Sequence, residues 1–143
     1  MKWINHTITT ITAVNLVGIN HPLDLILVGT GAIFPDAIEI KLQNLGIKVE
    51  HRGLSHSFLL WLIIFSIIIM FLYYKKTIWA RMGLSFVIGV FGHLFGDILT
   101  KTGIPLFVKQ PRIKLKLFKT GSIWEYMFSL ICIAYIGYKI YFN

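Results

Sequence analysis

Two short polar motifs lie beside or within apolar stretches of the sequence and carry side chains that bind metal ions. His51 and His56 are five residues apart in the segment His51-Arg52-Gly53-Leu54-Ser55-His56-Ser57, directly before an apolar run. His93 and Asp97 are four residues apart in a later apolar segment. Positions i and i+4 share one helix face, with Cβ atoms about 5–6 Å apart, so this pair can grip one cation. We interpret both motifs as parts of one metal site.

Further candidate groups follow from the order of the apolar segments along the chain. If successive segments alternate between the two sides of a membrane, eight titratable groups lie on the same side. They are His6, Asp36, Glu39, His51, His56, His93, Asp97 and Glu125. Composition does not force this convergence, which therefore favours a site at one face of a bilayer. Imidazoles and carboxylates without thiolates suit Zn²⁺ best, with Mn²⁺ or Fe²⁺ as alternatives, and one or more ions would fit.

Each motif also has a simpler interpretation. His93 and Asp97 could form only a hydrogen bond between helices, which would partner a carboxylate that costs at least about 2.5–3.5 kcal/mol in lipid. Arg52 could anchor its helix at the interface, or its planar fork could hold a phosphate. His6 could be solvated near the end of the chain.

The composition indicates an integral membrane protein. Of 143 residues, 56% are hydrophobic and 15% aromatic, which is too apolar for a soluble domain. Four crossings of about 20 residues would use more than half of the chain, so we expect a single membrane-embedded domain over residues 1–143. The single cysteine, Cys132, excludes an internal disulfide and disfavours a thiolate site.

The net charge of +8 indicates the orientation of the chain in a membrane and contact with anionic lipid headgroups. No nucleic acid partner is expected. Under the same alternation, ten basic residues lie on the side of the site: Lys2, Lys41, Lys48, Arg52, Lys101, Lys109, Arg112, Lys114, Lys116 and Lys119. The opposite side has four: Lys75, Lys76, Arg81 and Lys139. The positive-inside bias then predicts a multi-pass protein of the bacterial cytoplasmic (inner) membrane with a cytoplasmic site.

Three segments predict spanning helices: Phe58–Tyr74, Met82–Leu99 and Ile123–Phe142. Ser55 and Ser57 both suit the N-cap of the first segment. In the second segment, small residues such as Gly89 would let another helix backbone approach closely.

The N-terminal third predicts a short helical hairpin packed within the bundle. Asn5–Val17 and Leu23–Phe34 have about 12–13 residues each, or about 18–20 Å, short of a hydrocarbon core of about 30 Å. Pro35 is expected to end the second helix. Near 106–119, the alternation from Arg112 to Leu117 predicts a short basic β-like ribbon. The expected fold is therefore an all-α membrane bundle of about four to five helices with one such ribbon.

The motifs together resemble a known family, the YdjM-like inner-membrane proteins, described as LexA-regulated, membrane-bound, metal-dependent hydrolases. The resemblance covers most of the chain. It rests on His6, Phe34-Pro35-Asp36, the segment from His51 to Ser57, Gly92-His93-Leu94-Phe95-Gly96-Asp97, Thr100, Gly103-Ile104-Pro105-Leu106, and Thr120-Gly121-Ser122 with Glu125.

The resemblance implies distant kinship with zinc-dependent phospholipase C and single-strand nucleases, which hydrolyse phosphoesters at a zinc cluster. It implies metal ligands among His6, Asp36, His51, His56, His93 and Asp97, with Glu125 as a further candidate. We also expect Glu39 among the metal ligands, and catalytic roles for Asp97, Arg52 and Glu125. Many relatives read Pro-Asp-x-Asp-His, whereas this chain reads Pro35-Asp36-Ala37-Ile38-Glu39. One metal position is therefore altered or absent.

The favoured hypothesis is a metal-dependent hydrolase that cleaves a phosphoester, in a lipid or lipid-linked headgroup, at the bilayer surface. The alternative is a non-catalytic membrane protein in which the ion only holds helices together, serving as a sensor, a carrier or an accessory to envelope stress. A small transporter is disfavoured because the polar groups gather at one face instead of marking a path across the membrane. The sequence predicts neither the substrate nor the oligomeric state.

Overall fold

The computed structural model describes residues 2–108, 111–117 and 119–142. These residues form five α-helices: α1 (Trp3–Leu16), α2 (Pro22–Asn44), α3 (Phe58–Lys75), α4 (Ile78–Ile98) and α5 (Ile123–Phe142). A 3₁₀ turn, η1 (Leu54–His56), directly precedes α3. The predicted all-α class is confirmed. Lys109, one of the basic residues counted on the site side, lies outside the described residues.

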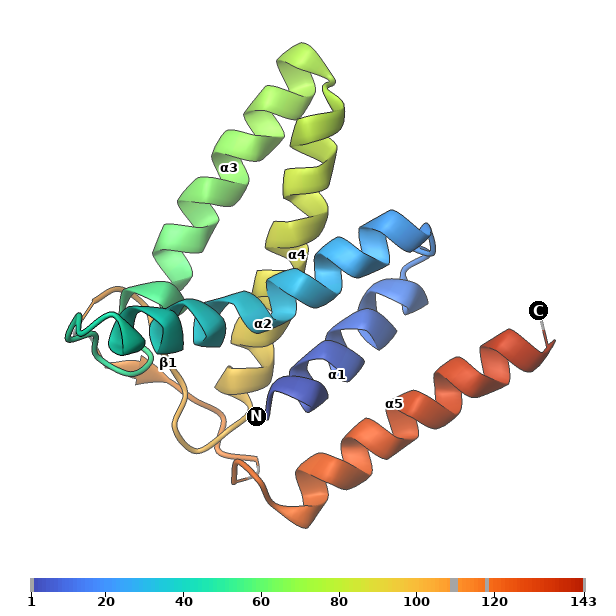
Figure 1. Ribbon diagram of the computed structural model, residues 1–143. Coiled ribbons are helices and arrows are strands. Elements are labelled where there is room, and N and C mark those ends of the chain that lie inside the picture. The colour runs from blue at the N-terminus through green and yellow to red at the C-terminus, as the bar shows by residue number, and fades with distance from the viewer. Residues whose placement is uncertain (1, 109–110, 118, 143) are drawn as a thin grey trace.

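Helix α4 is the centre of the packing and contacts α1, α2 and α3. Helices α3 and α4 form an antiparallel hairpin that projects from the other helices, and α1 lies between α2 and α5 (Figure 1). The predicted N-terminal hairpin is thus present as α1 and α2, and both of its helices pack against α4.

Three helices, α3, α4 and α5, are long and apolar enough to cross a membrane. Within α3, Trp61 is the one buried residue, so nearly the whole apolar helix faces its surroundings, as suits contact with lipid. Ser57 caps α3 by accepting a hydrogen bond from the N–H of Leu60 at 3.3 Å. Helix α4 begins before Met82 because Thr77 caps it in the same way, accepting from the N–H of Ala80 at 3.3 Å.

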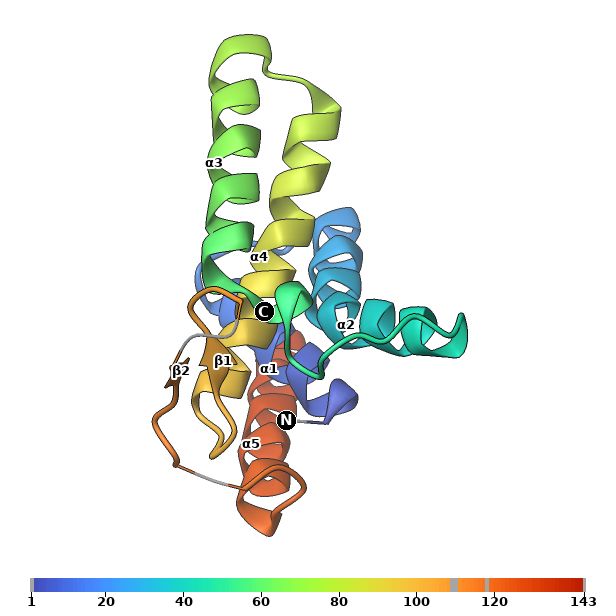
Figure 2. The same ribbon diagram turned by 90° about the vertical axis from the view of Figure 1, so that its left-hand side faces the viewer.

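The prediction that Pro35 ends the second helix is wrong. Helix α2 runs through Pro35 to Asn44, and Figure 2 shows that it changes direction along its length. A proline inside a helix lacks the N–H for the carbonyl four residues earlier and kinks the helix without having to end it. Here packing against α4 supports the helix on both sides of the kink.

Helices α2 and α4 cross with their backbones in close contact at Gly31 and Gly89. A methyl group on Gly31 would overlap the carbonyl oxygen of Phe86, and one on Gly89 would overlap that of Val28. Close approach at small residues was expected for α4, and the structure shows which helix approaches. The crossing lies about one turn from His93 and fixes that part of α4 against the middle of α2.

The predicted ribbon is present but shorter than the sequence pattern. Strand β1 (Ile104–Pro105) pairs antiparallel with β2 (Arg112–Ile113). The following residues leave the strand, and the N–H groups of Leu115 and Leu117 donate to the carbonyls of Ile98 and Leu99 at 2.7 and 2.9 Å. The last carbonyls of a helix have no partner within it, and here they take the donors that would otherwise have extended the strand.

Candidate metal centre

Side chains from α1, α2, η1 and α4 converge where α4 ends and α3 begins. Two overlapping groups offer ligand atoms that lie within 4.8 Å of one another: His6, His93 and Asp97, and Asp36, His56 and His93. Four of these five side chains are fully buried, and Asp36 keeps 15% of its side chain exposed. The five residues come from distant parts of the sequence, as the expectation of alternating sides required.

The hydrogen bonds of His56 and His93 fix which ring nitrogen faces the cluster. Nδ1 of His93 lies 2.7 Å from the carbonyl oxygen of Ala32, which can only accept, so this nitrogen carries the proton. Nδ1 of His56 lies 3.0 Å from Oε1 of Glu39 and donates in the same way. In the neutral rings both Nε2 atoms therefore present lone pairs, and they face each other at 3.1 Å. A cation between them would relieve that repulsion.

The nearest groups around the two Nε2 atoms are carboxylates. Oδ1 of Asp36 lies 3.2 Å from Nε2 of His56 and 3.8 Å from Nε2 of His93. Oδ2 of Asp97 lies 3.6 Å from each of the same two nitrogens. Three imidazoles with two carboxylates form a donor set that Zn²⁺ and related divalent ions accept. The residues present therefore fit a metal ion.

His6 completes the cluster from the first turns of α1. Its ring stacks on that of His93 with centroids 3.9 Å apart, and its Nε2 lies 3.3 Å from Oδ1 of Asp97. Nδ1 of His6 has no hydrogen-bond partner among the described residues. Burial lowers the pKa of His6 to about 4, so the ring is neutral at pH 7 and has a lone pair to offer. The solvated alternative for His6 is wrong.

The two groups share His93, whose Nδ1 is already occupied by Ala32. His93 therefore offers one ligand atom, Nε2, to both groups. An imidazole nitrogen binds one ion at a time, so the five residues form one centre and not two separate ones.

Glu39 stands behind the cluster and orients it. Its carboxylate accepts hydrogen bonds from Nδ1 of His56, from the hydroxyl of Ser55, from Nδ1 of His51 at 3.0 Å and from the N–H of Arg52 at 3.1 Å. Burial opposes ionisation, but these bonds outweigh it and hold the pKa of Glu39 at about 2. Carboxylates that orient a ligating histidine in this way raise its basicity and fix its ring.

Arg52 is buried in the site. Its backbone φ is 57°, in the left-handed region, and this turns the side chain inward. The guanidinium donates to Oδ1 of Asp97 at 2.8 Å and to the carbonyl of Gly103 at 3.3 Å. The interpretation of Arg52 as an interfacial anchor is therefore wrong, and its charge faces the centre.

In a comparison with protein-family models, the chain matches the family described as YdjM inner membrane protein over residues 1–143. The chain belongs to this family. Searches of curated proteins and of solved structures returned no match. The YdjM family name and the three apolar helices identify an inner-membrane protein, and the resemblance predicted from the motifs is confirmed.

Of the eight histidine and acidic residues expected at the site of this YdjM-family chain, three lie outside the two ligand groups. Glu39 orients His56, as described. His51 has a side chain that is 70% exposed, and it contacts Glu39 but belongs to neither group. The carboxylate of Glu125 accepts from the N–H of Lys2 at 2.6 Å, from Nδ2 of Asn5 at 2.5 Å and from the N–H of Gly121 at 2.8 Å. Glu125 thus holds the start of α1, directly before His6.

Several groups that the YdjM-family site uses could not be predicted from the sequence. The carbonyl of Ala32 sets the tautomer of His93, and it lies within the helical turn that Pro35 disturbs. Asn5 donates to Glu125. The hydroxyl of Thr100 lies 3.4 Å from the Arg52 guanidinium, and only the threonine's place in the family motif could have suggested a role.

Proposed function

We propose that the chain is a multi-pass, metal-dependent hydrolase of the inner membrane that cleaves a phosphoester of a lipid or lipid-linked headgroup at the bilayer surface. The observation that carries the proposal is the meeting of two imidazole Nε2 atoms, from His56 and His93, at 3.1 Å among carboxylates. A divalent cation held between the two nitrogens and the carboxylates would balance this arrangement.

The residues that would hold the ion are His6, Asp36, His56, His93 and Asp97. Zn²⁺ is the ion we expect, with Mn²⁺ or Fe²⁺ as alternatives. A divalent ion at this place would supply Lewis-acid activation of water and of a phosphoryl group.

The chain's own residues contribute orientation and charge. Glu39 fixes the ring of His56, and Ala32 fixes that of His93. The Nε of Arg52 has no hydrogen-bond partner within the described residues, so the guanidinium retains capacity to donate to an anionic phosphate. Asp36 keeps 15% of its side chain exposed while the other four ligands are fully buried, so a substrate would approach on its side.

The placement of the centre favours a substrate at the membrane surface. His56 lies two residues before the first residue of α3, and Asp97 lies one residue before the last residue of α4. Both helices are long and apolar enough to span a bilayer, so the centre sits where two candidate spans end. The excess of basic residues on this side of the chain favours the cytoplasmic face.

A second candidate function is a structural metal site that joins helices without catalysis. The burial of His6, His56, His93 and Asp97 favours it, since structural sites are closed by protein ligands whereas catalytic ones keep an open position.

Metal analysis and hydrolysis assays on the same purified samples test both functions. Wild type would be compared with Asp97→Ala and His56→Ala, and with His21→Ala, an exposed histidine outside the centre, as the matched control. We expect metal and phosphodiesterase or phospholipase activity in wild type and His21→Ala, and neither in the other two. Metal without hydrolysis of any phosphoester would favour the structural site. Wild type without a transition metal would overturn both.

Labelling of engineered cysteines tests the orientation. In a Cys132→Ser background, Lys48→Cys reports the side of the site and Lys76→Cys the opposite side. A cytoplasmic site predicts that a membrane-impermeant thiol reagent labels only Lys76→Cys in intact cells. Labelling of Lys48→Cys alone would place the site outside.

A further inference from the structure

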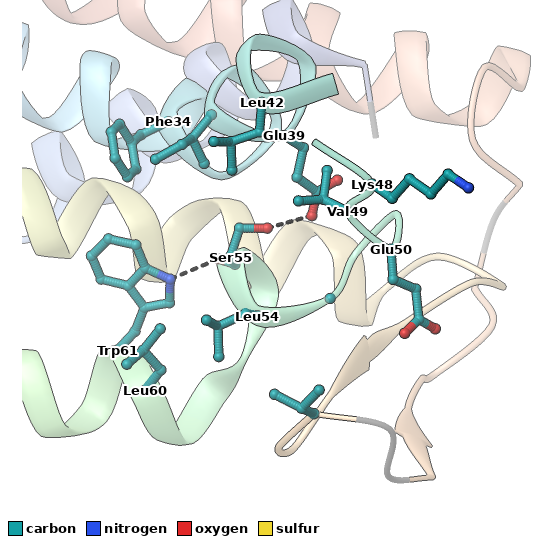
Figure 3. Close-up of a pocket in the computed structure, with 13 residues that line it drawn as sticks. Phe34, Glu39, Leu42, Lys48, Val49, Glu50, Leu54, Ser55, Leu60 and Trp61 are labelled. Carbon is teal, nitrogen blue, oxygen red and sulfur yellow. Dashed lines mark hydrogen bonds between the residues drawn. The ribbon is translucent and has the colours of Figure 1, made fainter. Parts of the chain in front are cut away.

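A pocket of about 420 Å³ lies beside the candidate centre, between α2, the loop before η1 and the first turn of α3. Figure 3 shows Phe34 and Leu42 on one side, with Leu54, Leu60 and Trp61 on the other. Its walls are therefore mostly apolar, and its volume is in the range of small-molecule sites. Nothing in the proposed chemistry of the centre uses this space.

We propose that this pocket binds one acyl chain of a membrane phospholipid. The inference deepens the proposed function and rests on it in one respect only, which is that the bound lipid would present its phosphate to the centre.

The position of the pocket on α3 favours lipid over other apolar occupants. Leu60 and Trp61 line it from the first turn of α3, an apolar helix that is long enough to cross a membrane and in which only Trp61 is buried. The pocket thus lies where a candidate span enters the bilayer. There the acyl chains of an inner membrane are the most abundant apolar groups, and they reach this level without leaving the bilayer.

The loop beside the pocket is also suited to lipid. Leu54 lines the pocket and is 56% exposed, and Leu45 and Ile47, in the loop that leads to it, are 67% and 49% exposed. Exposed apolar residues of this size in a membrane protein indicate contact with acyl chains. Lys48 follows directly and also lines the pocket, so a cation is available for an anionic headgroup.

The pocket and the candidate centre share a wall. Glu39 and Ser55 line the pocket, and both contact Nδ1 of His56, whose Nε2 faces the cluster. Dashed lines in Figure 3 mark the bond from Ser55 to Glu39 and the bond from Trp61 to the Ser55 backbone. A chain lying among the apolar residues would therefore leave its polar end near this shared wall.

Trp61 supplies a probe inside the pocket. It is only 6% exposed, and its indole N–H donates to the carbonyl of Ser55 at 2.7 Å, so its ring is held in place. A variant that keeps Trp61 and carries Trp3→Phe, Trp79→Phe and Trp124→Phe would be reconstituted in phosphatidylglycerol vesicles. Bromine on acyl chains quenches indole fluorescence at short range, so vesicles with brominated and unbrominated chains would be compared.

We expect brominated chains to quench Trp61 as strongly as Trp79, which is 76% exposed, measured in a matched variant that keeps only Trp79. Filling the pocket with Leu42→Phe and Val49→Phe should remove the quenching of Trp61 and leave that of Trp79 unchanged. The second probe shows that the filled protein is folded and inserted. Ile69→Phe, on an exposed part of α3 outside the pocket, should change neither signal.

Unquenched Trp61, or equal quenching with the pocket filled, would overturn the proposal and leave the pocket to an apolar protein segment. The measurement needs no hydrolysis, so it separates the two proposals. If Trp61 is quenched in a protein that hydrolyses no phosphoester, acyl-chain binding in the pocket is supported and the proposed hydrolase function is contradicted. If the protein hydrolyses phospholipids while Trp61 is unquenched, the proposed hydrolase function is supported and acyl-chain binding in the pocket is contradicted.

Discussion

Glu125 and the candidate metal centre are both buried polar clusters, and they differ in their balance of donors and acceptors. Three donors, from Lys2, Asn5 and Gly121, point at the Glu125 carboxylate. In the centre, the Nε2 atoms of His56 and His93 face each other, and the groups around them are carboxylates. A buried carboxylate with its own donors is complete, whereas two facing acceptor nitrogens need a positive charge between them, from a proton or from a metal ion.

The difference separates two uses of buried charge. A polar group buried without a partner costs free energy, so each cluster must be balanced within the folded protein. The Glu125 cluster is balanced by backbone and amide donors, which suits a joint between α1 and α5. In the centre, Arg52 donates to Oδ1 of Asp97, and in the proposed function a metal ion supplies further positive charge.

The most severe test removes the ligand that both groups share. His93→Ala should reduce bound metal to background, measured by elemental analysis of the purified protein. Loss of the ion should cost about 3–5 kcal/mol of unfolding free energy, the range for breaking a buried ion pair. A chelator should then lower the unfolding temperature of wild type but not of the variant. If His93→Ala retained the metal content of wild type, His93 would not be a metal ligand, and the proposed contrast between the centre and the Glu125 cluster would fail.

Removing the Glu125 carboxylate should destabilise the protein without emptying the centre. Glu125→Ala leaves three donors without their acceptor, at about 1 kcal/mol each, so unfolding free energy should fall by about 3 kcal/mol. Thermal unfolding in detergent and metal content of the folded protein would both be measured. Glu50→Ala, an exposed acid, is the control. Loss of metal with an unchanged unfolding free energy would show that Glu125 contributes to metal binding at the centre.

The crossing of α2 and α4 links the fold to the centre, and a methyl group tests it. Gly89→Ala should force the helices apart where Val28 touches Gly89, at a cost of about 1–3 kcal/mol for overpacking. Metal affinity should fall as well, since Asp36 belongs to α2 and His93 to α4, and the crossing of these helices brings the two side chains together. Gly137→Ala, on α5 with open space around it, should leave metal affinity unchanged and raise the unfolding free energy by about 1 kcal/mol at most, the gain in helix propensity. An equal loss of stability with both changes would show that the close contact at Gly89 is not responsible.

The sequence predicted the elements whose causes are local. The apolar run from Phe58 ends at two lysines, and Ile123–Phe142 agrees with α5 at both ends. Whether α2 ends at Pro35 does not depend on local sequence, because packing against α4 decides whether the kinked helix continues. The convergence of His6, Asp36, His56, His93 and Asp97 followed from counting crossings.

The roles of the acids could not be read from their types. Glu39 and Glu125 both appeared in the sequence as candidates for chemistry, and the distinction between them depends on which donors the fold delivers. Those donors include backbone N–H groups of Lys2, Arg52 and Gly121, which carry no sequence signal. The tautomer of His93 depends likewise on the backbone carbonyl of Ala32.

The smallest expected effect comes from Glu39, which combines features of both clusters. Like Glu125 it is surrounded by donors, but one of them is Nδ1 of His56, so its charge acts on the centre. Glu39→Gln keeps an oxygen that accepts from His56 and removes the charge. Metal affinity should fall about tenfold, or about 1.4 kcal/mol, the lower end for such orienting carboxylates. Competition with a chelator of known affinity would measure it, with Glu50→Gln as the control.

The outcome for Glu39→Gln decides whether the role of a buried carboxylate depends on the number of its hydrogen-bond donors or on its position beside the centre. Unchanged affinity would mean that a carboxylate with its own donors is structural even beside the centre, so Glu39 and Glu125 would belong together. A complete loss of metal would make Glu39 a direct ligand, as was expected from the sequence, and the ring of His56 would have to turn to admit the ion. A tenfold loss lies between these outcomes because Glu39 would then act on the ion only through the basicity and orientation of His56.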